Sequence, residues 1–153
     1  MKNFYQKGIT LWEILLAIAI VGILAVLVLP GFSKIRKIQI LKSTTEDIVS
    51  VIGQARSQTL ASLNSSAYGV HFETNRVILF TGTSFSSGAT SNQITNLISP
   101  ATISSISLSN SGADLYFNRL SGLPSATGTI MLTLPSVTSK TITISASGSV
   151  SAN

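Results

Sequence analysis

The longest feature of the hydrophobic pattern is a nearly continuous apolar run from Ile9 to Leu29. Only Thr10, Glu13 and Gly22 interrupt it, and Glu13 is its one charged residue. An apolar helix of about 20 residues is long enough to cross the hydrocarbon core of a bilayer. The run therefore predicts a helix that anchors the chain in a membrane.

Beyond this run, apolar and small residues recur every three or four positions, which is typical of an amphipathic helix. The stripe consists of Ile38, Leu41, Thr45, Ile48, Ile52, Ala55, Thr59 and Leu63. We expect this helix to end near Asn64 to Ser66 and to pack its stripe on a sheet. Gly22 and the pair Pro30 and Gly31 interrupt the helical pattern, and proline removes a backbone donor, so we expect a bend or local melting there.

From Ala67 the pattern changes to the alternation that is typical of strands. Tyr68, Val70 and Phe72 alternate with more polar residues, and a second run over residues 76–81 follows a short turn, which predicts a hairpin. Further β runs occupy residues 103–108, 114–117, 129–134 and 141–144, with Gly and Pro turn signals between them. The segment 83–99 is rich in Ser, Gly and Asn and is predicted to be a mobile loop.

These elements predict an α+β fold with room for one globular domain. A long N-terminal helix, with a membrane half over residues 9–29 and an amphipathic half over residues 30–66, is expected to pack on a small antiparallel β-sheet head. The head is expected to span residues 67–153.

The formal charge of +5 is concentrated beside the apolar run. Its main contributors are Lys2, Lys7, Lys34, Arg36, Lys37 and Lys42. Beyond Gln58 the cations are Arg76, Arg119 and Lys140, and they face the carboxylates Glu73 and Asp114, so the C-terminal part is close to neutral. The basic cluster after the run is expected to contact lipid headgroups or solvent rather than a specific partner.

The composition excludes several kinds of chemistry. The chain has no cysteine, which excludes disulfides, thiolate zinc sites and a thiol nucleophile. Its one histidine, His71, lies in an alternating strand pattern and is expected to face solvent or an interface rather than to act as a catalytic base. We therefore predict no catalytic residues, no metal site and no cofactor.

Glu13 distinguishes the apolar run from an ordinary anchor. A carboxylate in hydrocarbon costs about 2.5–3.5 kcal/mol on insertion scales and usually marks function or pairing. No lysine or arginine follows it within one helical turn. A conventional cleaved signal is disfavoured as well, because its one candidate site, Ala17-Ile18-Ala19, lies in the middle of the run.

The residues Lys7-Gly8-Ile9-Thr10-Leu11-Trp12-Glu13 resemble the class III signal of type IV prepilins and pseudopilins. The resemblance implies that residues 1–8 are a leader, that Gly8-Ile9 is the bond cut by the prepilin peptidase, and that Ile9 becomes the N-methylated first residue. It also implies that Glu13 is the glutamate of filament assembly and that Gly22, Pro30 and Gly31 occupy the family's glycine and proline positions. Trp12 departs from the family, which usually has an aliphatic residue there.

The same resemblance implies the partners and the location. The implied partners are other pilin or pseudopilin subunits, the prepilin peptidase and methyltransferase, an assembly platform and the cytoplasmic membrane. The chain would be single-pass with its head outside, before assembly into an extracellular pilus or a periplasmic or cell-wall pseudopilus. The lysines and arginines that follow the run conflict with this topology, because positive residues favour the cytoplasmic side, and we give the motif precedence.

The head pattern is similar to the H-type minor pseudopilins of type II secretion and to fimbrial-T minor pilins. This resemblance rests on the Tyr-Gly-Val-x-Phe hairpin and on a closing strand, Thr-Ile-Thr-Ile-Ser-x-x-Gly-x-Val. We expect a structural subunit of a type IV pilus or a type II secretion pseudopilus; the alternative is a DNA-binding or adhesive minor pilin. DNA binding is weakly supported, since only Arg119 and Lys140 offer phosphate contacts in the last third of the chain.

Overall fold

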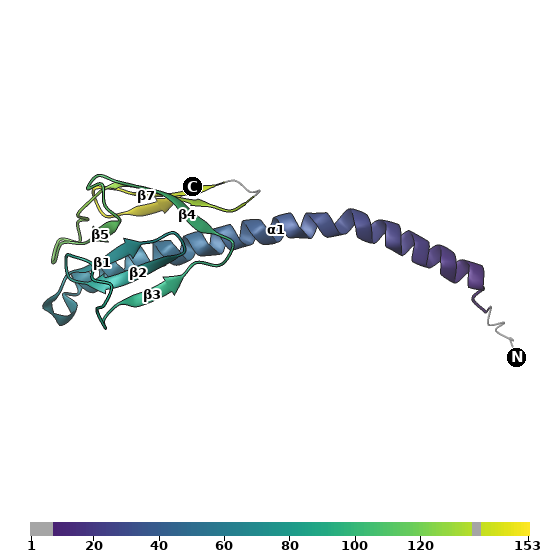
Figure 1. The fold of residues 1–153 in the computed structure, drawn as a ribbon, viewed down its shortest axis with the longest axis horizontal. Helices are drawn as coiled ribbons and strands as arrows, with labels where there is room; N and C mark the ends of the chain where they lie inside the picture. The colour runs from purple at the N-terminus through teal and green to yellow at the C-terminus, as the bar shows by residue number, and fades with distance from the viewer. Residues whose placement is uncertain (1–7, 136–138) are drawn as a thin grey trace, which may run out of the picture. The chain divides into compact units, whose positions relative to one another are not determined.

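The computed structural model describes residues 8–135 and 139–153, with the backbone alone described for residues 27–31. The chain divides into two compact units, an N-terminal unit, Met1–Arg36, and a head unit, Lys37–Asn153. Helix α1 (Leu11–Leu60) contributes to both units. Within the described residues eight strands follow it, and several of them are labelled in Figure 1. The α+β fold predicted from the sequence, a long N-terminal helix packed on an antiparallel β head, is confirmed.

The strands form two antiparallel sheets instead of the one small sheet expected. The first has the order β3-β2-β1-β5 and consists of β3 (Gln93–Asn96), β2 (Arg76–Thr81), β1 (Tyr68–Phe72) and β5 (Asp114–Tyr116). The second has the order β4-β6-β7-β8 and consists of β4 (Thr102–Leu108), β6 (Gly128–Thr133), β7 (Lys140–Ile144) and β8 (Val150–Ala152). A shift of register between Ile103 and Ser105 marks an irregularity in β4.

The predicted hairpin is confirmed as β1 and β2, paired antiparallel with Val70 opposite Leu79. The predicted loop over residues 83–99 contains a strand, β3, that the sequence did not show. Its side chains are largely exposed, so its placement comes from backbone pairing with β2 rather than from apolar burial. Such an edge strand carries little of the alternation by which strands are recognised.

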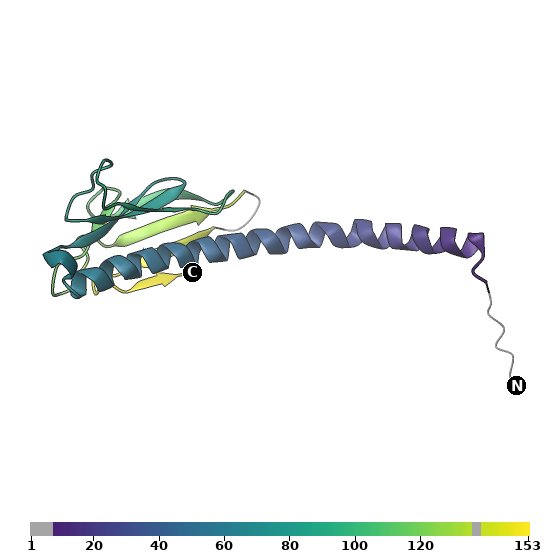
Figure 2. The same cartoon turned by 90° about the horizontal axis from the view of Figure 1, so that it is seen from below.

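One hydrophobic core joins the head half of α1 to both sheets. Figure 2 shows this half of the helix running along the strands. The helix contributes Leu41, Ile48, Val51, Ile52 and Ala55; the first sheet and its flanks contribute Tyr68, Val70, Phe72, Val77, Leu79, Leu115 and Phe117; the second contributes Ile103, Leu108, Ile130, Leu132, Leu134, Ile142 and Ile144. The predicted stripe is therefore the buried face, except at its two ends, where Ile38 and Leu63 are about half exposed.

The helix ends at Leu60, before the predicted stop near Asn64. A 3-10 turn, η1 (Leu63–Ser65), follows, and Ser62 and Asn64 adopt positive φ. Buried Thr59 holds this reversal, because its Oγ1 donates to the Ala55 carbonyl at 2.8 Å and accepts the Tyr68 N–H at 2.9 Å. At the end of the helix, the Thr59 hydroxyl therefore provides a hydrogen-bond acceptor for the buried amide of Tyr68, the first residue of β1.

Candidate functional site

The first turn of α1 contains the residues of the predicted signal. The Glu13 amide donates to the Thr10 carbonyl at 3.1 Å and to Thr10 Oγ1 at 3.3 Å, and the Ile14 amide donates to the same carbonyl at 3.3 Å. Thr10 is thus the N-cap of the helix. Sequence reasoning did not identify this role, although threonine followed by glutamate three residues later is a known pattern of helix starts.

Gly8 and Ile9 lie immediately before this cap, outside the helix, and both are exposed. The Ile9 side chain is 73% exposed, and no atom lies within 4 Å of the position that a Cβ at Gly8 would take. The Gly8-Ile9 peptide bond is therefore in accessible, non-helical chain. Residues 1–7, which include most of the predicted leader, lie outside the described residues.

Glu13 is exposed in the first helical turn. A carboxylate is favourable there because the unpaired amides at a helix start carry partial positive charge. Within the described part of the chain Glu13 makes no ion pair. The structure thus brings Gly8, Ile9 and Glu13 together at one helix start.

The three predicted kink residues lie within α1. Gly22 is exposed, and nothing lies within 4 Å of the position of a Cβ there, so packing within this chain does not require a glycine. The backbone is helical at Pro30 and Gly31 as well, while their side chains lie outside the described residues. The predicted bend or melting stays a prediction.

Over residues 11–26, the apolar side chains face outward on every side of the helix. Between Leu11 and Val26 the large apolar side chains are 49% to 77% exposed. Trp12, Leu15, Leu16 and Ala19 surround a hollow of about 260 Å³ on the helix surface. Among the described residues, the structure contains no helix that is both sufficiently long and sufficiently apolar to traverse a membrane.

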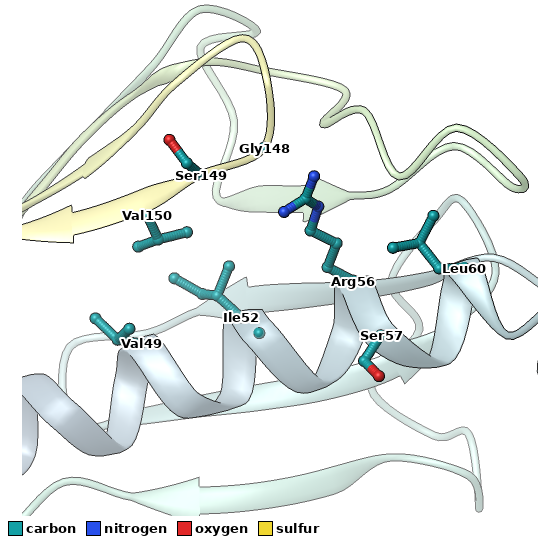
Figure 3. Close-up of a pocket in the computed structure, with 9 residues that line it drawn as sticks. Val49, Ile52, Arg56, Ser57, Leu60, Gly148, Ser149 and Val150 are labelled. Carbon is teal, nitrogen blue, oxygen red and sulfur yellow. The ribbon is translucent and has the colours of Figure 1, made fainter.

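In the head unit, Arg56 of α1 links two turns of the second half of the chain, and Figure 3 shows its side chain pointing toward the turn at Gly148. Its Nε donates to the Gly122 carbonyl at 3.1 Å, and its Nη2 donates to the Ser147 carbonyl at 3.0 Å. Gly148, at φ 77°, fits beside it because a Cβ there would lie 2.7 Å from the Gly122 oxygen. Sequence analysis did not single out Arg56, since neither of its partners is near in sequence.

A groove of about 380 Å³ adjoins Arg56, between α1 and the turn that leads into β8 (Figure 3). Its walls are largely apolar and are formed by Val49, Ile52, Gly53, Leu60 and Val150, with Arg56 among its polar residues. A second hollow, of about 220 Å³, lies between α1 and the end of β8, where Lys42, Thr45, Glu46, Lys140 and Ala152 form it. The two hollows therefore follow one another along the same pair of elements.

His71, which was expected to face solvent or an interface, is partly buried and contacts three neighbouring side chains. Its Nδ1 lies 2.5 Å from Asp114 Oδ1, its Nε2 lies 3.8 Å from Glu73 Oε1, and its ring stacks on Phe85 at 3.9 Å. Arg76 donates to both oxygens of Glu73, at 2.7 and 3.2 Å, and this hydrogen bond lowers the pKa of Glu73. Among the described residues, no group of three or more metal-binding side chains is placed to hold an ion.

The two cations considered for DNA contacts lie near different parts of α1. Arg119 donates to Ser62 Oγ at 2.8 Å, just beyond the helix end, whereas Lys140 lies with Lys42 at the second hollow. Lys42 and Leu60 are separated by about 27 Å at the helical rise of 1.5 Å per residue. Arg119 and Lys140 therefore do not form one phosphate-binding patch.

Comparison with known proteins gives one match. Residues 3–29 match the family model of the prokaryotic N-terminal methylation motif. Neither the curated proteins nor the solved structures yield a match. The match covers the end of the predicted leader, the Gly8-Ile9 bond, Glu13 and the apolar run, and it supports a type IV pilin-like precursor.

Proposed function

We propose that this chain is a structural subunit, a pilin, minor pilin or pseudopilin, of a type IV pilus or a type II secretion pseudopilus. The observation that carries the proposal is the methylation motif over residues 3–29, with Gly8-Ile9 just before the capped helix start. The H-type and fimbrial-T resemblance of the head remains a further expectation within this proposal.

In this proposal the prepilin peptidase cuts between Gly8 and Ile9, and Ile9 is then N-methylated. The accessible, non-helical chain at these residues supports the cut, because a protease needs an extended peptide in its active site. The Thr10 cap keeps the helix start one residue beyond Ile9. The new ammonium group would therefore emerge beside the first helical turn.

Glu13 acts in assembly by pairing with the ammonium of Ile9 in a neighbouring subunit. Its placement in the first turn, exposed and without an ion-pair partner in the described residues, supports this role. Two opposite charges attract strongly in a low-dielectric filament core, and each carries a large desolvation penalty if it is left alone there. The pairing would set the axial register of one subunit against the next.

The apolar N-terminal helix serves as anchor in the cytoplasmic membrane and later as the filament core. Its apolar side chains, exposed on all sides, require an apolar environment or neighbouring helices. The hollow around Ala19 supports packing, because it can receive a side chain of another helix. The head would lie outside the membrane, and assembly would involve an ATPase-driven platform, with a bend or melting at Gly22, Pro30 and Gly31.

A DNA-binding or adhesive minor pilin is the second class of function for the same machinery. The separation of Arg119 from Lys140 disfavours duplex DNA as the ligand. Binding of the full chain to duplex DNA at two salt concentrations tests this, since phosphate-driven binding must weaken steeply as salt rises.

The proposed function is tested by the intact mass and N-terminal sequence of the chain from membranes or sheared filaments of cells that express a prepilin peptidase. We expect a chain that begins at methylated Ile9. Gly8→Val should leave the chain beginning at Met1, whereas Gly22→Val should be processed normally. A wild-type chain that still begins at Met1, or that is cut beyond Leu29, would contradict the proposal.

A further inference from the structure

The outer edge of β8 is an open strand edge. Thr141 and Asn153 exchange two backbone hydrogen bonds of 3.0 Å, and the Ser145 amide donates to the Ser149 carbonyl at 3.0 Å. Because hydrogen-bonded and non-hydrogen-bonded pairs alternate in an antiparallel ladder, Val150 and Ala152 turn their N–H and C=O groups away from β7. β8 is last in its sheet, so within the described residues no strand pairs with these groups.

The groove between α1 and β8 lies along this open edge. Its floor is apolar and includes Val49, Ile52 and Val150, and Gly53 leaves open space above the helix. Leu60, which is 44% exposed, closes the apolar part at the end of α1. At about 380 Å³ the groove is at the lower end of the range of ligand pockets, about 300–1,000 Å³.

Arg56 supplies a positive charge at one defined end of the groove. Its guanidinium is fixed by the Gly122 and Ser147 carbonyls, and no acidic side chain lies within ion-pair distance of it in the part of the chain that is described. Ser147 precedes β8, so Arg56 lies at the end where β8 begins. A strand added antiparallel to β8 runs in the opposite direction and reaches Arg56 with its carboxyl end.

We propose that this groove binds the free carboxyl terminus of an extended peptide from a partner protein. The peptide pairs with the open edge of β8 at Val150 and Ala152, its terminal apolar side chain lies over Gly53, and its carboxylate binds Arg56. Strand addition supplies affinity through main-chain hydrogen bonds, while the pocket and the charge supply specificity. This inference does not depend on the assembly role of Glu13.

The test uses the full chain in zwitterionic detergent micelles and fluorescein-labelled hexapeptides of sequence Thr-Val-Thr-Val-Ser-X, with X being Val, Ile, Leu or Phe. Fluorescence anisotropy is measured for each peptide with a free carboxylate and with a carboxamide end, and against empty micelles. We expect saturable binding of at least one free peptide and about tenfold weaker binding of its amide, because a hydrogen bond to a charged group contributes about 1.5–3 kcal/mol.

Two variants separate the groove from the rest of the head. Ala152→Pro removes an outward N–H without touching the β7 ladder, and Gly53→Leu fills the groove on an exposed helix face. Both should abolish peptide binding. Ile94→Pro has the same outward position on the open edge of β3 and should bind normally.

Thermal unfolding of each variant shows whether the head remains folded, and Gly53→Leu should unfold no earlier than wild type. The inference is overturned if no hexapeptide binds saturably up to about 1 mM, a limit that corresponds to about 4 kcal/mol. It is also overturned if the amide binds as tightly as the acid, or if Ile94→Pro weakens binding as much as Ala152→Pro does.

Discussion

The two units of the chain use apolar residues in opposite ways. In the N-terminal unit the large apolar side chains from Leu11 to Val26 are all about half exposed or more. In the head unit the apolar residues of the same helix, such as Ile48 and Ile52, are almost fully buried among strands. The difference shows that the head has a hydrophobic core of its own, whereas the described apolar side chains of the N-terminal unit are not buried within this chain.

The strongest test of this difference is to replace one isoleucine by alanine in each unit and to compare the losses of stability. Ile52→Ala should destabilise the head by about 2–5 kcal/mol, because the residue is fully buried and leaves a cavity. Ile18→Ala, at a 65% exposed position of the same helix, should change head stability by less than about 0.5 kcal/mol. Chemical denaturation followed by near-UV circular dichroism of the tyrosines measures both; equal effects would contradict the division into two units.

The next largest expected loss of stability comes from the hydrogen bond between Thr59 of α1 and Tyr68 of β1. Thr59→Val removes the hydroxyl that accepts the Tyr68 amide and should cost about 1–3 kcal/mol, since a buried donor is left unpaired. Thr44→Val is the matched control, because Thr44 Oγ1 is buried and has no partner within the described residues. The control should be neutral or stabilising in the same denaturation experiment. A loss of stability in Thr44→Val as large as that in Thr59→Val would contradict this assignment.

Replacing a helical glycine by alanine should also affect the stability of the head differently in the two units. Gly53→Ala should stabilise the head by about 0.5–1 kcal/mol, because Gly53 is an exposed interior helix position with open space around its Cβ. Gly22→Ala should not change head unfolding at all. The two variants are compared by thermal unfolding, and a stabilisation of the head by Gly22→Ala would show that the units unfold together.

The smallest expected effect is a pH dependence confined to the head. The hydrogen bond from Arg76 lowers the pKa of Glu73, so the pair stabilises the folded state above the ordinary glutamate pKa. That contribution is lost as the pH falls from about 4.5 through the lowered pKa. The melting temperatures of wild type and Glu73→Gln should therefore differ slightly at pH 7 and converge once the pH falls below the lowered pKa of Glu73. Glu46→Gln, at a largely exposed carboxylate, is the control and should show no such convergence.

Sequence alone predicted those parts of the molecule whose patterns are local. The buried stripe of α1 and the β1-β2 hairpin were read correctly, because helical and alternating periods each reveal one buried face. The strand β3 was missed because its residues are exposed and its order comes from pairing with β2. The split into two sheets also depends on pairing between distant strands, which periodicity does not encode.

In the candidate site, too, only features that depend on residues close in sequence could be predicted. The roles of Gly8, Ile9 and Glu13 were implied by the resemblance of residues 7–13 to the class III signal, and they stay predictions, although the matched methylation motif covers these residues. The Thr10 cap could have been found from its spacing to Glu13. The role of Arg56 could not have been found from the sequence, because it depends on two carbonyls that lie near Arg56 only in the folded head.

The contacts of Arg56 also join segments of the chain that are synthesised at different times. Its two carbonyl partners lie 66 and 91 residues further along the chain. The helix is made first, and its buried stripe has no complete cover until the last strands have been synthesised. Contacts of such long range form late, and the helix face is prone to aggregation until they do. A ribosome stalled before Ser147 would therefore leave a chain with a complete helix α1 and an incomplete head.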